Sequence, residues 1–246
     1  HIGNFDSLDQ LRNEKFSISN PDKTGALFVC CEKLKPYAPQ GSYFFGNSSE
    51  SHSRILSVSD GTMHLNLLGE KLTANIPGGG QHRALTMSAV LLAQKLLGLD
   101  ISGSLELTEE AIPEGRGNET KVAGITIVDD SYNANPESML AALTFMTQDK
   151  SPGRKIAVLG EMLELGNITA SEHKKMAKVF SAFDKVFLVG EGFKETDSSG
   201  WFPEANTDLI AEVEAYAKPG DKILIKGSNR IFWAKNFVDK LVESMK

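Results

Sequence analysis

Strand-like and helical patterns alternate along the second half of the chain. Short apolar runs typical of strands occupy residues 124–129, 155–160, 185–190 and 222–226, and segments with apolar residues at helical spacing occupy 136–146, 171–183, 207–217 and 231–245. Strands that alternate with helices of this length indicate βαβ units and a parallel sheet. We therefore predict a complete α/β domain over residues 113–246, with a mostly parallel, Rossmann-like sheet.

The first half of the chain has a different pattern. Strand-like runs lie at 26–31, 42–45, 54–58, 63–68 and 71–76, helical runs at 7–15 and 86–97, and a short helix with a linker at 101–112. Turn signals at Asp60 and Gly61, and at Gly69 and Glu70, separate the last three strands, as in a small antiparallel meander. We predict that residues 1–112 are the end of another α/β domain.

Composition and charge narrow the function classes. The chain has 246 residues, of which 41% are apolar and 24% charged, as in a globular protein of one or two domains. Its net charge of −6 argues against a nucleic-acid partner, which needs a basic surface. The adjacent Cys30 and Cys31 give no disulfide framework, which favours a reducing compartment. The best apolar helix, 89–97, is too short to span a membrane. We expect a cytoplasmic protein.

A polar bend follows the first strand of the second half. The apolar run 125–128 ends at Asp129 and Asp130, and the polar segment 131–135 leads to a helix that begins near Pro136. In open α/β sheets, ligands bind beyond the carboxyl ends of the strands. Asp, Ser and Asn also favour turns and helix N-caps. The local pattern therefore fits a ligand site and a structural turn equally well.

The sequence DDSYNANPESMLAAL, residues 129–143, resembles the signature of the Mur ligase family. The resemblance implies an ATP-dependent amide ligase of peptidoglycan precursor synthesis. Such an enzyme uses ATP and Mg²⁺ to join UDP-N-acetylmuramoyl-tripeptide to D-alanyl-D-alanine through an acyl phosphate. On this interpretation residues 1–112 are the C-terminal part of the central ATP-binding domain, and residues 113–246 are the C-terminal domain.

The phosphate-binding loop that such chemistry needs is absent from the sequence. No G-x-x-x-x-G-K-[ST] segment, whose backbone and lysine cradle phosphates, occurs in the 246 residues. We therefore expect N-terminal domains of the same enzyme as partners of this chain. We also expect the 246 residues alone to be inactive.

The resemblance implies three site residues in the first half. His1 and Lys15 are similar to a metal-ligating histidine and to a lysine that the family carbamylates, so both would be catalytic and would hold Mg²⁺. His82 would bind ATP, although Arg83 stands where the family has an Asn that reaches the adenine. Cys30 also departs from the family pattern. The structural alternatives are a terminal histidine and a solvated helix lysine.

The remaining site residues implied by the resemblance lie in the second half. Arg116 would reach the ATP phosphates, and Asp130 would bind the ATP ribose. The residues that would bind the dipeptide are Tyr132, Asn133, Asn135, Lys226 and Ser228. An exposed linker arginine and a solvated lysine at a strand end are the structural alternatives for Arg116 and Lys226.

Two other hypotheses remain open. The departures at Cys30 and Arg83 fit a catalytically degenerate relative that serves as a binding or regulatory module. Another amide ligase of the superfamily, acting on folate or diaminopimelate, is a further alternative. The Asp-Asp-Ser-Tyr-Asn-Ala-Asn bend argues against it, because those relatives resemble a different sequence there.

Overall fold

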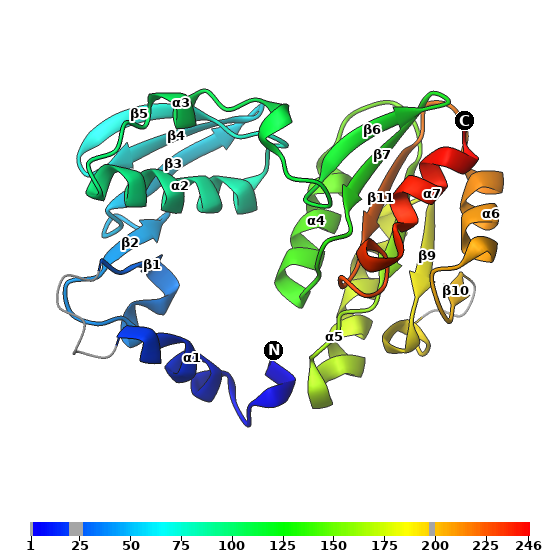
Figure 1. Cartoon of the computed structure of the whole chain (residues 1–246), viewed down its shortest axis with the longest axis horizontal. Coiled ribbons are helices and arrows are strands. Elements are labelled where there is room, and N and C mark those ends of the chain that lie inside the picture. Colours follow the sequence, from blue (N-terminus) through cyan, green and yellow to red (C-terminus); the bar gives the residue numbers. More distant parts are fainter. Residues whose placement is uncertain (1, 20–26, 197–199) are drawn as a thin grey trace. The chain divides into compact units, whose positions relative to one another are not determined.

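The computed structural model describes residues 2–19, 27–196 and 200–246 of the chain (Figure 1). Apart from residues 1–3, the chain divides into two compact units, residues 4–112 and residues 113–246. We call these the N-terminal unit and the C-terminal unit. Among the described residues, no helix has the length and apolar character needed to cross a membrane.

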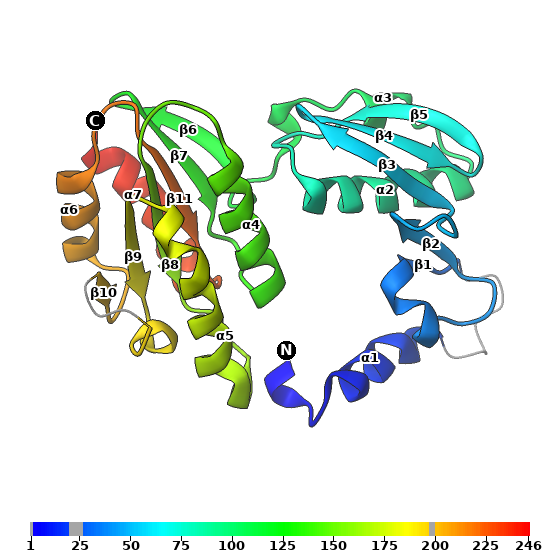
Figure 2. The same ribbon diagram turned by 180° about the vertical axis from the view of Figure 1, so that it is seen from behind.

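The N-terminal unit is built on a five-stranded sheet in the order β1-β2-β3-β4-β5. Its strands are β1 (Val29–Cys31), β2 (Tyr43–Gly46), β3 (Ser53–Ser59), β4 (Thr62–Leu67) and β5 (Glu70–Asn75). β3, β4 and β5 are antiparallel, which confirms the predicted meander, whereas β1 and β2 run parallel to their neighbours. The α-helices in the described part of this unit are α1 (Leu8–Phe16), α2 (Gln81–Leu96) and α3 (Ser102–Leu105) (Figure 2).

Helix α2 covers one face of this sheet (Figure 1). Its buried residues, among them Met87 and Leu91, pack against Leu65 and Leu67 of β4. The helix begins at Gln81, five residues earlier than predicted. The early start follows Gly80, which adopts a φ of 88° and leads the chain into the first turn. Because the first turn of α2 is polar, the hydrophobic pattern did not show where the helix begins.

The C-terminal unit is built on a six-stranded sheet in the order β10-β9-β8-β11-β7-β6. Its strands are β6 (Asn118–Val122), β7 (Ile125–Asp130), β8 (Lys155–Gly160), β9 (Lys185–Val189), β10 (Trp201–Phe202) and β11 (Lys222–Lys226). All neighbouring pairs are parallel except β6 and β7. This confirms the predicted mostly parallel sheet. The edge strands β6 and β10 were not predicted, because β6 is mainly polar and β10 has two residues.

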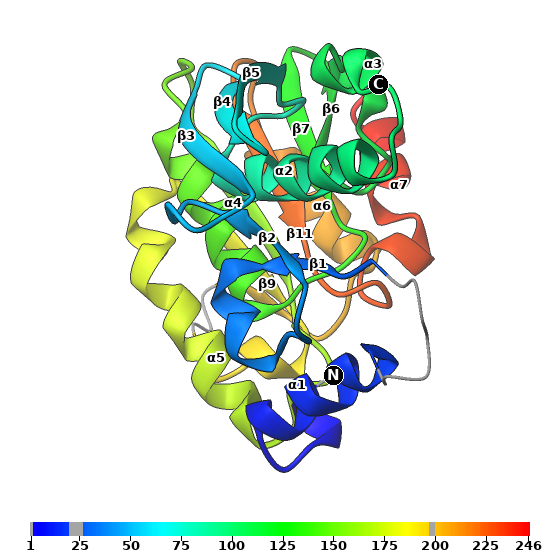
Figure 3. The same ribbon diagram turned by 90° about the vertical axis from the view of Figure 1, so that its left-hand side faces the viewer.

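Helices cover both faces of this sheet (Figures 1, 2 and 3). The helices α4 (Pro136–Gln148) and α5 (Thr169–Met176) lie on one face, and α6 (Thr207–Tyr216) and α7 (Phe237–Ser244) lie on the other. Burial on both faces explains why the central strands read as continuous apolar runs and not as alternating ones.

Two predicted helices of the C-terminal unit are shorter than their periodicity suggested. The segment 171–183 continues past α5 as the 3₁₀ turn Ala177–Ala182. The segment 231–245 is divided by Asn236, which has a left-handed φ of 51°, into the 3₁₀ turn Trp233–Lys235 and α7. The apolar residues keep helical spacing on both sides of Asn236, so the sequence pattern did not show that the helix is interrupted there.

Candidate functional site

Two strand ends of the C-terminal unit are joined by a buried ion pair. Lys226, the last residue of β11, lies in register with Asp130, the last residue of β7. Its Nζ donates to Asp130 Oδ2 at 2.8 Å and to the backbone oxygen of Asn133 at 3.1 Å. Lys226 is only 2% exposed, whereas the Asp130 side chain is 23% exposed. The lysine is therefore no solvated strand end, and it fixes the polar bend that follows β7.

Asp129 and Asp130 project to opposite faces of the sheet, as successive strand residues do. Asp129 lies on the face of Ile125 and Ile127, which pack towards α6 and α7. Asp129 accepts from the backbone N–H of Ser131, and its burial raises its pKa. The two acids of the bend thus have different surroundings, and only Asp130 lies beside Lys226.

The bend leaves three of its side chains open to solvent. Tyr132, Asn133 and Asn135 are exposed, and none of them is sealed beneath other side chains. Asn135 is the N-cap of α4: its Oδ1 accepts from the backbone N–H of Ser138 at 2.9 Å, in a capping box. Asn135 is therefore already engaged in starting the helix. Asn133 Oδ1 likewise accepts from the backbone N–H of Ala134 at 2.9 Å, but Asn133 starts no helix. Tyr132 and Asn133 are therefore the side chains of the bend that are best placed to meet a ligand.

Arg116 contacts the bend directly. Its Cζ lies 4.1 Å from the centre of the Tyr132 ring, and that ring meets Trp233 edge-on at 5.5 Å. Gly115, with a φ of 70°, permits this packing, because a Cβ there would lie 2.6 Å from the Trp233 ring. The structure thus brings together Arg116 and Tyr132, two predicted site residues. It adds Trp233, which the sequence interpretation missed and which begins the 3₁₀ turn Trp233–Lys235 in the connection between β11 and α7.

Ser228 links the loops after two other strands. Its Oγ accepts from the backbone N–H of Leu163 at 2.8 Å, and its own N–H donates to the Glu161 backbone oxygen at 3.2 Å. Glu161 Oε2 in turn accepts from the backbone N–H of Gly192 at 2.8 Å. The loops that follow β8, β9 and β11 are therefore tied to one another. Ser228 is 4% exposed and holds a loop in this structure.

His173 is a structural residue that the sequence interpretation did not identify. It is fully buried, and its Nε2 accepts from the backbone N–H of Met162 at 2.8 Å. Its Nδ1 must therefore carry the proton, which it donates to the Thr169 oxygen at 2.7 Å. Burial lowers the pKa of His173. The neutral ring thus anchors the loop that follows β8.

We expect His173→Phe to lower the free energy of unfolding by about 1–3 kcal/mol at pH 7.5, because the buried Met162 N–H loses its acceptor. The deficit should shrink at pH 5.5. In the wild type the unfolded state takes up a proton below the ordinary His pKa of about 6.5, while the folded His173 resists it, so wild-type stability falls with pH. Urea unfolding at both pH values measures the difference. An equal deficit at both would contradict this assignment.

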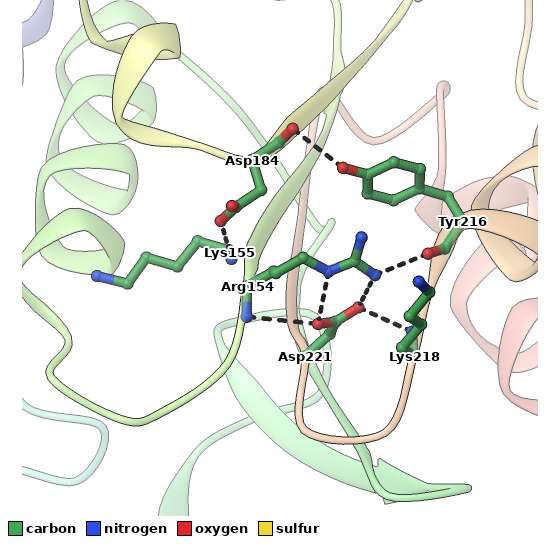
Figure 4. Close-up of polar contacts among 6 residues, drawn as sticks. All are labelled: Arg154, Lys155, Asp184, Tyr216, Lys218 and Asp221. Atoms are coloured by element: carbon green, nitrogen blue, oxygen red, sulfur yellow. Dashed lines mark hydrogen bonds and ion pairs between the residues drawn. The ribbon is translucent and has the colours of Figure 1, made fainter.

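At the opposite edge of the sheet, where the parallel strands begin, charged side chains pair with one another (Figure 4). Asp221, which is 3% exposed, accepts from Arg154 Nη2 at 2.6 Å and Nε at 3.1 Å, and from the backbone N–H of Lys218 at 2.8 Å. Burial alone would raise the pKa of Asp221, but these donors outweigh it and lower the pKa. Lys222 is likewise paired with Asp149 at 2.6 Å. These groups satisfy one another, so this edge is structural.

Comparison with known proteins identifies the C-terminal unit. Residues 115–229 match the family model described as Mur ligase, glutamate ligase domain. This part of the chain belongs to the Mur ligase family. The UDP-N-acetylmuramoyl-tripeptide–D-alanyl-D-alanine ligase of Bacillus subtilis is 30% identical over 99% of this chain, and its counterpart in Rickettsia prowazekii is 28% identical over 99%. The chain spans 57% and 58% of these two relatives.

Solved structures of Mur ligases share the fold. The MurF ligase of Thermotoga maritima in complex with ADP superposes with a TM-score of 0.81 at 22% identity, covering 100% of this chain and 60% of that one. MurF of Acinetobacter baumannii gives a TM-score of 0.81 at 21% identity, covering 99% of this chain and 57% of that one. These structures show the shared fold, and the family model with the two relatives confirms the resemblance seen at residues 129–143.

Of the three Mur ligase residues predicted in the first half of the chain, the structure describes Lys15 and His82. Lys15 is exposed in the last turn of α1, and His82 is exposed in the first turn of α2. His1 lies outside the described residues. Arg83 donates to the Pro77 backbone oxygen at 3.0 Å, so this departure from the family pattern has a local structural role. Within the described parts of the chain, no group of three or more His, Cys, Asp or Glu residues fits a metal ion.

Proposed function

We propose that this chain is part of an ATP-dependent ligase that joins D-alanyl-D-alanine to UDP-N-acetylmuramoyl-tripeptide in the cytoplasm. The observation that carries the proposal is the pair of Lys226 and Asp130. It fixes a bend with the family signature at the carboxyl edge of a parallel sheet, where α/β proteins bind ligands. The names of the two similar relatives support the choice of substrates.

Each residue of the edge has a proposed task. Asp130 accepts from a ribose hydroxyl of ATP with the carboxylate oxygen that is partly exposed. Arg116, whose guanidinium carries several donors, binds the phosphates. Tyr132 and Asn133 contact the dipeptide, and Lys226 acts through its hold on the bend. Asn135 and Ser228 position the loops on either side.

The task of the edge is to orient the amine of the dipeptide towards an activated carboxyl group. Correct placement of two reactants contributes several kcal/mol to the lowering of a barrier. Activation of that carboxyl requires a phosphate-binding loop, which must come from outside the 246 residues because they contain no such motif. ATP and Mg²⁺ are cofactors of the whole enzyme in this proposal. Within the described residues, no group of three or more His, Cys, Asp or Glu side chains fits a metal ion, so Mg²⁺ needs ligands from beyond them.

A phosphate-release assay of the complete enzyme tests the proposal. We expect release only when ATP, UDP-N-acetylmuramoyl-tripeptide and D-alanyl-D-alanine are all present, with a product whose mass includes the dipeptide. Release driven by glutamate or diaminopimelate would assign the chain to another ligase of the superfamily. Binding of the substrates without any release would favour the degenerate binding module.

A further inference from the structure

A cavity of about 270 Å³ lies within the C-terminal unit, next to the end of β7. Residues of β6, of the end of β7 and of the segment from Trp233 to α7 line it. Asp129 belongs to this cavity, whereas Asp130 projects to the other face and pairs with Lys226. The cavity is therefore separate from the ion pair that fixes the bend.

The charged side chains of the cavity are all acidic. Glu114, Asp129 and Asp239 line it, and none of the described lining residues is basic. Asp129 is 7% exposed, and a carboxylate in such a place is stabilised by an opposite charge. The carboxylates do not form a group that fits a metal ion within the described residues. The cavity thus suits a positive charge carried by a molecule larger than a single metal ion.

Ser131 provides a second and independent observation. It lines the cavity, is 1% exposed, and its Oγ has no hydrogen-bond partner. The hydroxyl lies close enough to the Asp129 carboxyl to lower its pKa, although the net effect of burial there is to raise it, and no Ser131 Oγ contact meets the distance and angle of a hydrogen bond. A buried hydroxyl without a partner costs about 1–3 kcal/mol. A ligand with several N–H donors would satisfy both Ser131 and Asp129.

The rest of the lining is aromatic and aliphatic. Trp233, held edge-on by Tyr132, and Phe237, which is 2% exposed, form part of the wall. Aromatic faces attract organic ammonium ions more than hydrated metal ions, because the apolar body of the ligand is desolvated at the same time. The ligand that fits carries an ammonium group on a short apolar chain.

We propose that this cavity binds the ammonium end of a small alkylamine, supplied either as a free amine or as the basic side chain of a peptide. The inference goes beyond the proposed ligase activity and does not depend on it. Glu114 and Asp239 supply the charge at the rim, Asp129 and Ser131 receive the N–H groups, and Trp233 covers the chain of the ligand.

Tryptophan fluorescence of the 246-residue chain measures the binding. Trp233 lines the cavity and Trp201 does not, so a Trp201→Phe background isolates the signal. Titrations at pH 7.5 and constant ionic strength use 1,5-diaminopentane, Nα-acetyl-L-lysine amide and, as a neutral control, 1-pentanol. We expect at least one of the two amines to saturate the signal and 1-pentanol to fail. The amine that binds identifies the source, free amine or peptide side chain.

Matched variants locate the site. Asp239→Asn should weaken binding about fivefold or more, whereas Glu243→Gln, on the same helix but outside the cavity, should leave it unchanged. Ser131→Ala should also weaken binding while the unfolding midpoint stays level or rises, because the removed hydroxyl had no partner. Equal binding by Asp239→Asn and Glu243→Gln, or no saturation by either amine, would overturn the proposal.

Discussion

Lys226→Met is expected to lower kcat/KM of the complete ligase by about 100-fold. The change frees Asp130 and the backbone oxygen of Asn133 from their common donor, so the bend loses the contact that fixes it. Displacement of a positioning element by about 1 Å costs a factor of this size. Steady-state phosphate release with all three substrates measures the loss.

Lys222→Met is the matched control for this prediction. Lys222 lies at the other end of the same strand and pairs with Glu119 at 2.7 Å and Asp149 at 2.6 Å. Its replacement should lower stability but leave kcat/KM within about threefold, because the opposite edge carries no ligand in this account. Equal losses of activity in the two variants would show that both lysines act only through stability.

Asp221→Ala is expected to lower the free energy of unfolding of the C-terminal unit by about 3 kcal/mol. The change removes the carboxylate that accepts from the Arg154 guanidinium and from the Lys218 backbone N–H, and leaves the guanidinium with the Tyr216 backbone oxygen (Figure 4). Breaking a buried pair costs about 3–5 kcal/mol, and the lower end applies here because the Arg154 side chain is 30% exposed. Urea unfolding followed by tryptophan fluorescence reports on this unit alone, since Trp201 and Trp233 are the only tryptophans of the chain.

Glu204→Ala provides the comparison for Asp221→Ala. Its carboxylate pairs with Lys235 at 3.1 Å on the surface, and such pairs contribute at most about 1 kcal/mol.

The contribution of Asp221 to stability also depends on pH. Because the pKa of Asp221 is lowered in the fold, the contribution is present above the ordinary Asp pKa of about 3.9 and is lost as the pH falls below it. Similar losses in the free energy of unfolding for Asp221→Ala and Glu204→Ala at neutral pH would contradict the structural role of Asp221.

The sheet of the C-terminal unit was predictable because its central strands are buried on both faces. The runs at 155–160 and 222–226 are continuous and apolar, which set them apart from the helices between them. The edge strand β6 was missed because it has one buried position, Val122, and polar residues elsewhere. Hydrophobic pattern locates buried strands well and exposed edge strands poorly.

The site was predicted in part. The bend and its strand-end position followed from the sequence at 129–135, but the contacts that organise it join residues far apart in the chain. Lys226 and Asp130 are 96 residues apart, and the sequence around each of them does not indicate that they pair in register. The packing of Arg116 on Tyr132 depends in the same way on Gly115 and Trp233.

The central claim is that the carboxyl edge of this sheet meets the ligands and the opposite edge does not. Backbone amide NMR of the 246-residue chain, titrated with D-alanyl-D-alanine, tests it directly. We expect the largest shift changes at Tyr132, Asn133 and Ser228, with Lys218 and Asp221 unmoved. Changes centred on Lys218 and Asp221, with the bend unmoved, would contradict it.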